Sequence, residues 1–182
     1  MTEPIDRDQP EFTAFVAASS ARLLRTAWLL TLNREQAQDL VQLAYAKTFA
    51  VWRRVRRDDA ESYARRVLVN SHIDWWRRAP WRERATAELP DQPSNDSATA
   101  TAAIAERAAL AAALRELTKR ERTIVVLRYY LDVSEADVAD QLRVSVGTVK
   151  STASKALAKL RESQELADFR PLARAFALEE QR

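Results

Sequence analysis

A cluster of amines and hydroxyls near the C-terminal end carries chemistry that suits a phosphate backbone. Its members are Lys150, Ser151, Thr152, Ser154 and Lys155. The surrounding segment, residues 141–161, contains no acidic residue. Lysines reach phosphates or guanine edges and hydroxyls reach either, so this cluster predicts contact with duplex DNA. The competing interpretation is an ordinary solvated helix face.

Two short helices must position this cluster. Ser134 is expected to cap the first, through Leu142, and Ser145 the second, through about Glu162. Gly147, the only glycine of the chain, lies in the first turn of the second helix. Two such short helices cannot stabilise themselves, so a preceding helix from Thr118 to Leu131 must complete the core. The order of elements predicts a helix-turn-helix, whose second helix enters a major groove.

A second cluster, of arginines and tryptophans, spans residues 53–84. It holds ten arginines, five acids and three tryptophans. Bases stack on aromatic faces while guanidinium groups hold phosphates, so the mixture is typical of single-stranded nucleic-acid binding. Trp75 and Trp76 are about 100° apart on a helix, so at least one of them is expected in the core.

Composition limits the fold class and the chemistry. The chain has 182 residues, 47% apolar and 30% charged, with one glycine and no cysteine. We predict an all-α protein with two small helical domains joined by a flexible acidic linker. His72 is the only histidine, and no catalytic constellation or glycine-rich phosphate loop is visible. We therefore expect no enzyme activity, no catalytic residue, no metal and no cofactor.

Helical periodicity and composition predict the organisation of the chain. The first domain, residues 1–82, has helices over about 11–32, 33–52 and 60–78 with a charged loop over 53–61. Leu40, Ala44 and Phe49 are expected in its core. An acidic linker, 83–103, precedes the helix-turn-helix domain, 104–162, and a tail of unassigned role, 163–182. No apolar run could span a bilayer and the N-terminus resembles no export signal, so a cytoplasmic protein is expected.

These motifs together resemble a bacterial extracytoplasmic-function (ECF) sigma factor. This is the minimal two-domain branch of the sigma-70 family, and the likeness is to a short actinobacterial-type subgroup over about Phe12 to Leu160. The segment Asp39-Leu-Val-Gln resembles the family's docking segment for the polymerase clamp, and residues 62–78 resemble its minus-10 reader. Residues 117–130 and Ser145-Val-Gly-Thr-Val-Lys-Ser resemble its minus-35 reader.

The resemblance implies that the protein binds core RNA polymerase, through its clamp coiled coil and flap, and directs promoter recognition, DNA melting and transcription initiation. Catalysis then belongs to the polymerase. An anti-sigma factor is a further candidate partner, expected to clamp the two modules together and cover the recognition helix. The implied polymerase-binding residues are Asp39, Leu40 and Gln42. The implied minus-10 residues are Arg56, Arg57, Arg66, Asn70 and Trp75, and the implied minus-35 residues are Lys150, Ser151, Thr152, Ser154 and Lys155.

Three positions depart from the family pattern. Thr152 stands where many members have arginine, and Ala153 where a larger apolar residue is common. Arg143 occupies a turn position that glycine often fills. If that turn needs a positive φ, arginine costs about 1 kcal/mol there.

Two other classes of function remain open at this point. A stand-alone helix-turn-helix regulator that binds duplex DNA without polymerase would account for the C-terminal half, but would leave residues 39–84 without a purpose. A pure interaction module would not need the acid-free segment.

Overall fold

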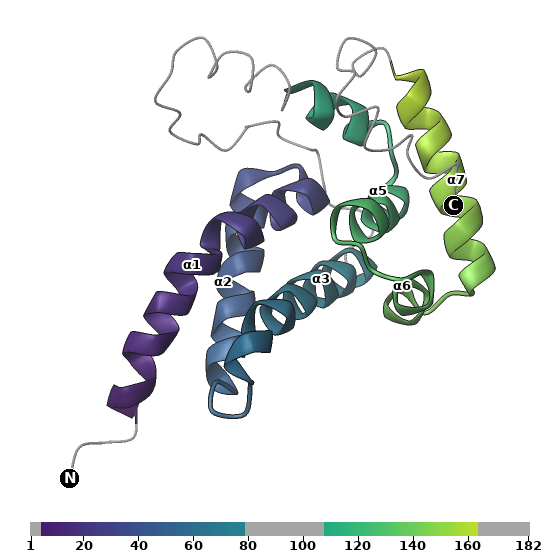
Figure 1. Ribbon diagram of the computed structural model, residues 1–182. Helices are drawn as coiled ribbons and strands as arrows, with labels where there is room; N and C mark the ends of the chain where they lie inside the picture. Colours follow the sequence, from purple (N-terminus) through teal and green to yellow (C-terminus); the bar gives the residue numbers. More distant parts are fainter. Residues whose placement is uncertain (1–4, 79–107, 164–182) are drawn as a thin grey trace. The chain divides into compact units, whose positions relative to one another are not determined.

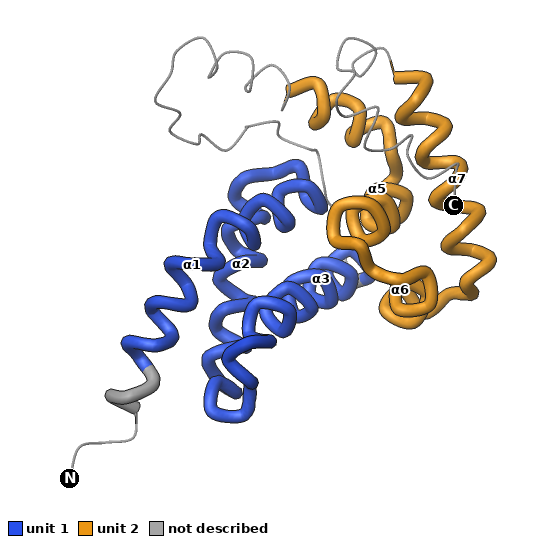
Figure 2. Tube along the Cα trace, in the orientation of Figure 1, with its two compact units in different colours: residues 1–85 blue, residues 86–182 orange. Residues whose placement is uncertain are grey.

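The structure is a computed structural model that describes residues 5–78 and 108–163. These residues form helices and no strand, and the chain divides into two compact units, residues 1–85 and 86–182 (Figure 2). The predicted linker, 83–103, and all of the predicted tail except Ser163 lie outside the described residues.

Three long helices build unit 1 (Figure 1). They are α1 (Ile5–Thr31), α2 (Arg34–Ala50) and α3 (Ala60–Arg78), and the 3₁₀ turn η1 (Arg57–Asp59) precedes α3. The helix α1 begins at Ile5 rather than near Glu11, and Pro10 lies inside it. Asn33 caps α2, its side chain accepting a hydrogen bond from the Gln36 backbone N–H at 2.9 Å.

The core of unit 1 forms where the three helices meet. Its largest fully buried side chains are Leu23, Leu30, Leu32, Thr48, Leu68, Val69 and Ile73. Leu40 and Ala44 are buried as expected, at 3% and 0% exposure. The expectation for Phe49 is wrong, because its side chain is 39% exposed. Phe49 lies at the end of α2, where one side of its ring contacts Phe12, with centroids 4.9 Å apart, and the remainder faces solvent.

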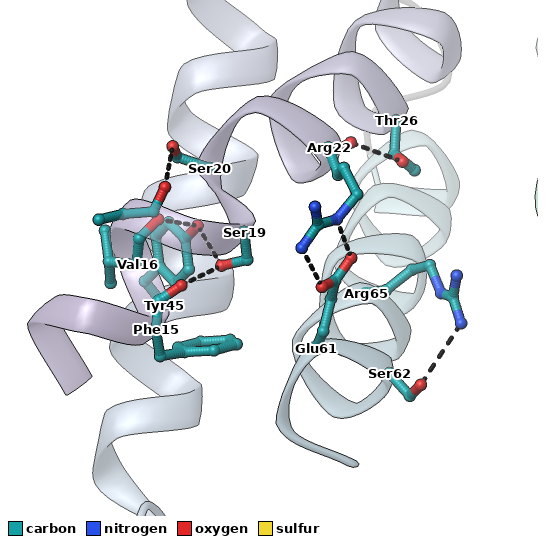
Figure 3. Close-up of polar contacts among 11 residues, drawn as sticks. Phe15, Val16, Ser19, Ser20, Arg22, Thr26, Tyr45, Glu61, Ser62 and Arg65 are labelled. Atoms are coloured by element: carbon teal, nitrogen blue, oxygen red, sulfur yellow. Dashed lines mark hydrogen bonds and ion pairs between the residues drawn. The ribbon is translucent and has the colours of Figure 1, made fainter. Parts of the chain in front are cut away.

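An ion pair joins α1 to α3, and a hydrogen bond joins α1 to α2. Arg22 donates two hydrogen bonds to the Glu61 carboxylate, Nε to Oε1 and Nη2 to Oε2, both 2.7 Å (Figure 3). These hydrogen bonds lower the pKa of Glu61 and raise that of Arg22. On the same helix, Ser19 shares a 2.9 Å hydrogen bond with the Tyr45 hydroxyl, whose pKa is raised by burial (Figure 3).

Arg57 is held by three contacts at the end of the charged loop. Its guanidinium lies 4.2 Å from the centre of the Trp52 ring, within the range of a cation–π interaction. Its Nη1 donates to the Trp52 carbonyl at 2.7 Å, and its Nε donates to Glu11 Oε2 at 3.0 Å. Trp52 is 3% exposed, so Arg57 connects the loop to the core and to α1.

Unit 2 is a set of short helices. Residues 108–115 are helical, followed by α5 (Lys119–Val125), the π-helical turn η2 (Val126–Tyr130), α6 (Glu135–Leu142) and α7 (Val146–Glu162). The sequence predicted one α-helix from Thr118 to Leu131, whereas its second part is π-helical, with the Leu131 N–H donating to the Val126 carbonyl at 3.0 Å. Because π-helical turns shift the register of a helix, η2 redirects the chain toward α6.

The predicted caps of unit 2 are confirmed. Ser134 and Ser145 cap α6 and α7 by accepting from backbone N–H groups, each at 3.1 Å. Thr118 and Glu121 form a complete capping box at the start of α5. Lys159, from α7, donates to both oxygens of Glu121 at 2.8 and 2.9 Å.

The turn between α6 and α7 is left-handed. Arg143 has φ 53° and ψ 53°, and its N–H caps α6 by donating to the Asp140 carbonyl at 3.2 Å. The condition under which arginine is unfavourable at this turn is therefore met. Of the described residues, Leu32 and Asp132 also have positive φ, at 52° and 51°.

We expect Arg143→Gly to stabilise the protein by about 1 kcal/mol, because glycine adopts this backbone conformation without a Cβ clash. Urea unfolding measures the change. Arg143→Ala is the matched control, since it removes the same charged side chain but keeps the Cβ. Equal stability of the two variants would show that the charge, and not the backbone, sets the difference.

We expect Arg57→Ala to lower stability by about 1 kcal/mol through loss of its charge-assisted hydrogen bonds and ring contact. Arg56→Ala is the control, because the Arg56 side chain is 82% exposed and its ion pair with Asp59 is long, at 3.8 Å. Thermal unfolding compares the two. Equal melting temperatures of the two variants would show that the contacts of Arg57 with Trp52 and Glu11 do not stabilise the fold.

The Glu121 carboxylate should make stability depend on pH on the acid side. Burial raises its pKa, but hydrogen bonds from Lys159 and Thr118 outweigh burial, so the folded pKa lies below the ordinary 4.5. Its stabilising contribution is then complete above the unfolded pKa and is lost as pH falls through the folded value. Glu121→Gln keeps a capping side chain but not the charge. We expect the stability difference between wild type and Glu121→Gln, measured by urea unfolding, to shrink below about pH 4.5; a constant difference would refute this.

Candidate nucleic-acid interface

The exposed face of α7 carries most of the predicted minus-35 residues. Lys150, Ser151, Ser154 and Lys155 are exposed, and Thr152 is half-buried at the edge of this face. The four exposed positions span an arc of about 140°. The opposite side of the helix is buried and consists of Val149, Ala153, Ala156, Leu157 and Leu160.

Gly147 lies at the start of this face and is not required by the protein's own packing. A Cβ added there would meet only the Ser145 hydroxyl, at 3.9 Å, which is an ordinary contact. Its φ is not positive. A helical glycine costs about 0.5–1 kcal/mol relative to alanine, and no contact among the described residues of unit 2 accounts for it. The space above Gly147 instead permits close approach of another molecule to the helix.

Two lysines of the acid-free segment pair with glutamates from other helices. Lys150 Nζ lies 3.5 Å from Glu135 Oε2 in the first turn of α6, and Lys159 is bound by Glu121. The sequence analysis missed both pairs. The partners lie 15 and 38 residues apart in sequence, so only packing of α5, α6 and α7 brings them together.

The α3 helix presents some of the predicted minus-10 residues together. Arg66 and Asn70 are both exposed and, four positions apart, lie about 40° from each other around the helix. Trp75 is 36% exposed but lies about 140° from Asn70, so α3 does not bring it onto the same face. The expectation that at least one of the two rings lies in the core is not met, because Trp75 is exposed and Trp76 is only half-buried.

The two predicted arginines of the charged loop differ in their surroundings. Arg56 extends into solvent, with a side chain 82% exposed. The Arg57 side chain is 45% exposed, and its guanidinium is engaged by Glu11 and Trp52. Arg57 therefore fixes the loop, whereas Arg56 is available to a ligand.

The exposed side of α2 carries two of the three predicted polymerase-binding residues. Asp39 and Gln42 are exposed. Leu40 is 3% exposed, so its side chain anchors α2 in the core and is not on the surface. Leu43 is 41% exposed, and the sequence analysis did not select it. An apolar residue off the buried stripe of α2, next to Gln42, was the signal that could have identified it.

Neither a metal site nor a membrane span is found in the part of the chain that the structure describes. No group of three or more histidine, cysteine, aspartate or glutamate side chains is arranged to hold a metal ion there. No described helix is long and apolar enough to cross a bilayer. His72 is 5% exposed within α3.

Comparisons with known proteins identify the family of this chain. Residues 107–160 match the family described as Sigma-70, region 4. The chain is 40% identical over 153 residues to the RNA polymerase sigma-E factor of Streptomyces coelicolor, covering 84% of this chain and 85% of that protein. It is 33% identical over 155 residues to the ECF RNA polymerase sigma factor SigM of Mycobacterium tuberculosis, covering 84% and 76%.

The fold also matches a solved structure. The sigma factor RpoE of Bartonella quintana, crystallised with the anti-sigma factor NepR, aligns with a TM-score of 0.62 at 20% identity. The alignment covers 86% of this chain and 98% of that one. Since the Streptomyces and Mycobacterium relatives are each matched over 84% of this chain, well beyond region 4, this chain belongs to the ECF RNA polymerase sigma factors of the sigma-70 family.

Proposed function

We propose that this sigma factor binds core RNA polymerase in the cytoplasm and directs it to promoters, with α7 in the major groove of the minus-35 duplex. The observation that carries the proposal is the exposed arc of Lys150, Ser151, Ser154 and Lys155 above a buried apolar stripe. Lysines and hydroxyls on one face of a recognition helix can contact both phosphates and base edges. Thr152 contributes from the edge of this arc.

The first turn of α7 adds a second feature to this docking. The free amides at the start of the helix favour an anion, and the bare Cα of Gly147 lets a phosphate approach them. No contact among the described residues requires glycine at this position, and this supports the proposed role of Gly147.

For the minus-10 element, we propose that Arg56, Arg66 and Asn70 bind unpaired bases and their phosphates. Extruding a base costs a few kcal/mol, which contacts in the complex must offset. Arg57 acts indirectly here, by holding the charged loop against Trp52 and Glu11. Trp75 is a separate stacking platform, worth about 1–3 kcal/mol per stacked base if one reaches it.

For the polymerase, we propose that the exposed side of α2 docks on the clamp coiled coil through Asp39, Gln42 and Leu43. An exposed leucine between polar neighbours is the usual composition of a small interface core with a polar rim.

We also propose domain boundaries at residues 82, 103 and 162. In the complex with polymerase, the acidic linker 83–103 would thread the polymerase cleft toward the RNA path, and unit 2 would reach the flap. Bond formation is then carried out by the polymerase and not by this chain.

An anti-sigma factor is a proposed regulatory partner. The structural neighbour from Bartonella quintana was crystallised with one. Covering the α7 face would block the proposed minus-35 contact. The stand-alone regulator is not favoured, because sequence identity to named sigma factors extends over 84% of the chain rather than over the helix-turn-helix alone.

Run-off transcription tests the function. Purified core RNA polymerase and fragmented DNA of the source genome are mixed with and without this chain. New, discrete start sites preceded by two elements at fixed spacing are the expected result. Lys150→Ala should reduce transcript yield and promoter affinity, by about fivefold or more, since it removes a charge-assisted contact.

Two comparisons make this experiment decisive. Asp39→Ala should weaken binding to core polymerase and leave helix content, measured by circular dichroism, intact. Footprints on duplex DNA from the chain alone, with no new transcripts, would favour the stand-alone regulator instead.

A further inference from the structure

The fold holds a carboxylate against the proposed DNA-binding face of α7. Glu135 Oε2 lies 3.5 Å from Lys150 Nζ, and the two side chains are 34% and 64% exposed. Residues 141–161 contain no acid. The negative charge beside Lys150 therefore comes from Glu135, which the packing of α6 on α7 brings to this face.

The position of Glu135 is fixed by the start of α6. The Ser134 hydroxyl accepts from the Asp137 N–H at 3.1 Å and donates to Asp137 Oδ2 at 2.6 Å. Three buried side chains anchor the same helix, namely Val138, Ala139 and Leu142. The capped first turn therefore presents Glu135 to Lys150, while Asp137 is engaged with the cap.

An amine with an acidic partner discriminates between its ligands. A phosphate contact requires Lys150 to exchange one anion for another while the duplex backbone repels the Glu135 carboxylate. A guanine edge offers neutral acceptors, and an ammonium has three donors, so Lys150 can bind such an edge without losing Glu135. The ion pair is exposed and contributes only about 0–1 kcal/mol, so DNA can displace it at a modest cost.

We propose that Glu135 is a specificity-determining residue of promoter recognition. It suppresses contacts of Lys150 to phosphates on any duplex and favours sites where Lys150 finds a base acceptor. This inference rests on the proposed function, because it assumes that the α7 face binds the minus-35 duplex.

The neighbouring acid Asp140 supplies a matched control. It is exposed on the same helix, carries the same charge, and forms no ion pair with any described residue. Glu135→Gln and Asp140→Asn therefore change the net charge equally, but only the first releases Lys150. The two variants separate a local effect from a general electrostatic one.

The test uses holoenzyme assembled from core RNA polymerase and the full chain. Affinities are measured for a promoter duplex whose sequence was identified by run-off transcription and for a scrambled duplex of equal length, across a range of salt concentrations. We expect Glu135→Gln to raise affinity for the scrambled duplex and to lower the promoter-to-scrambled ratio by about twofold to fivefold relative to Asp140→Asn. The salt dependence on the scrambled duplex should steepen by about 0.9, the slope of one added phosphate contact.

The outcomes separate this inference from the proposed function. If Lys150→Ala weakens promoter binding but Glu135→Gln and Asp140→Asn have the same ratio and salt slope, the role of Glu135 is overturned and the docking stands. If Lys150→Ala leaves promoter affinity unchanged, the docking itself is wrong and the inference falls with it. In the Lys150→Ala background, Glu135→Gln should no longer change the ratio; a persistent change would also overturn the proposal.

Discussion

Burial of one side of α7 is the constraint on which the proposed DNA-binding face depends. A helix of 17 residues is only marginally stable alone, and α7 is held by packing against α5 and α6. Two of its buried residues, Ala153 and Ala156, are small, and this lets the neighbouring helices approach closely. Because the buried stripe fixes the rotation of α7, it also fixes the direction of every polar side chain on the other side. Specific contact with a base requires this orientation as much as it requires the charges.

In unit 1, positive charge is divided between holding the fold and facing outward. Arg22 is bound by Glu61, which connects α1 to the start of α3, and Arg57 is bound by Glu11, which connects α1 to the loop before α3. Other arginines, such as Arg56 and Arg66, extend from the same region into solvent. The number of arginines in the sequence therefore overstates the number available to nucleic acid. The bound arginines contribute by keeping the charged loop and α3 in place beneath the exposed ones.

The elements of this fold were predictable wherever the signal is local. Helix caps such as Ser145 depend on residues three positions apart, so they were predicted correctly. The buried stripe of α7 is a local signal of the same kind, because it follows helical periodicity. The roles of Arg57 and Glu135 depend on partners far along the chain, which no local pattern specifies. Leu40 shows a different limit. A motif assigns a whole segment to a partner, whereas burial decides which of its side chains the partner can touch.

The π-helical turn and Phe49 were missed for related reasons. The π-helical turn follows α5 directly and differs from it in its hydrogen bonds, which run from i to i+5 in place of i to i+4. Phe49 lies about 100° around α2 from Thr48, which is fully buried, so its ring falls at the edge of the buried stripe and not within it. The ring then packs sideways on Phe12 and remains open to solvent on its other side.

Glycine is absent from the described positions where the backbone favours it and is present where the backbone does not need it. The three described residues with a left-handed backbone, Leu32, Asp132 and Arg143, all carry side chains, while the single glycine lies in a regular helix. Selection for thermal robustness alone would move glycine from position 147 to these turns. A library of variants screened only for expression or heat tolerance should therefore enrich alanine at position 147, and such survivors would fold well yet carry a methyl group at the proposed point of contact with the duplex.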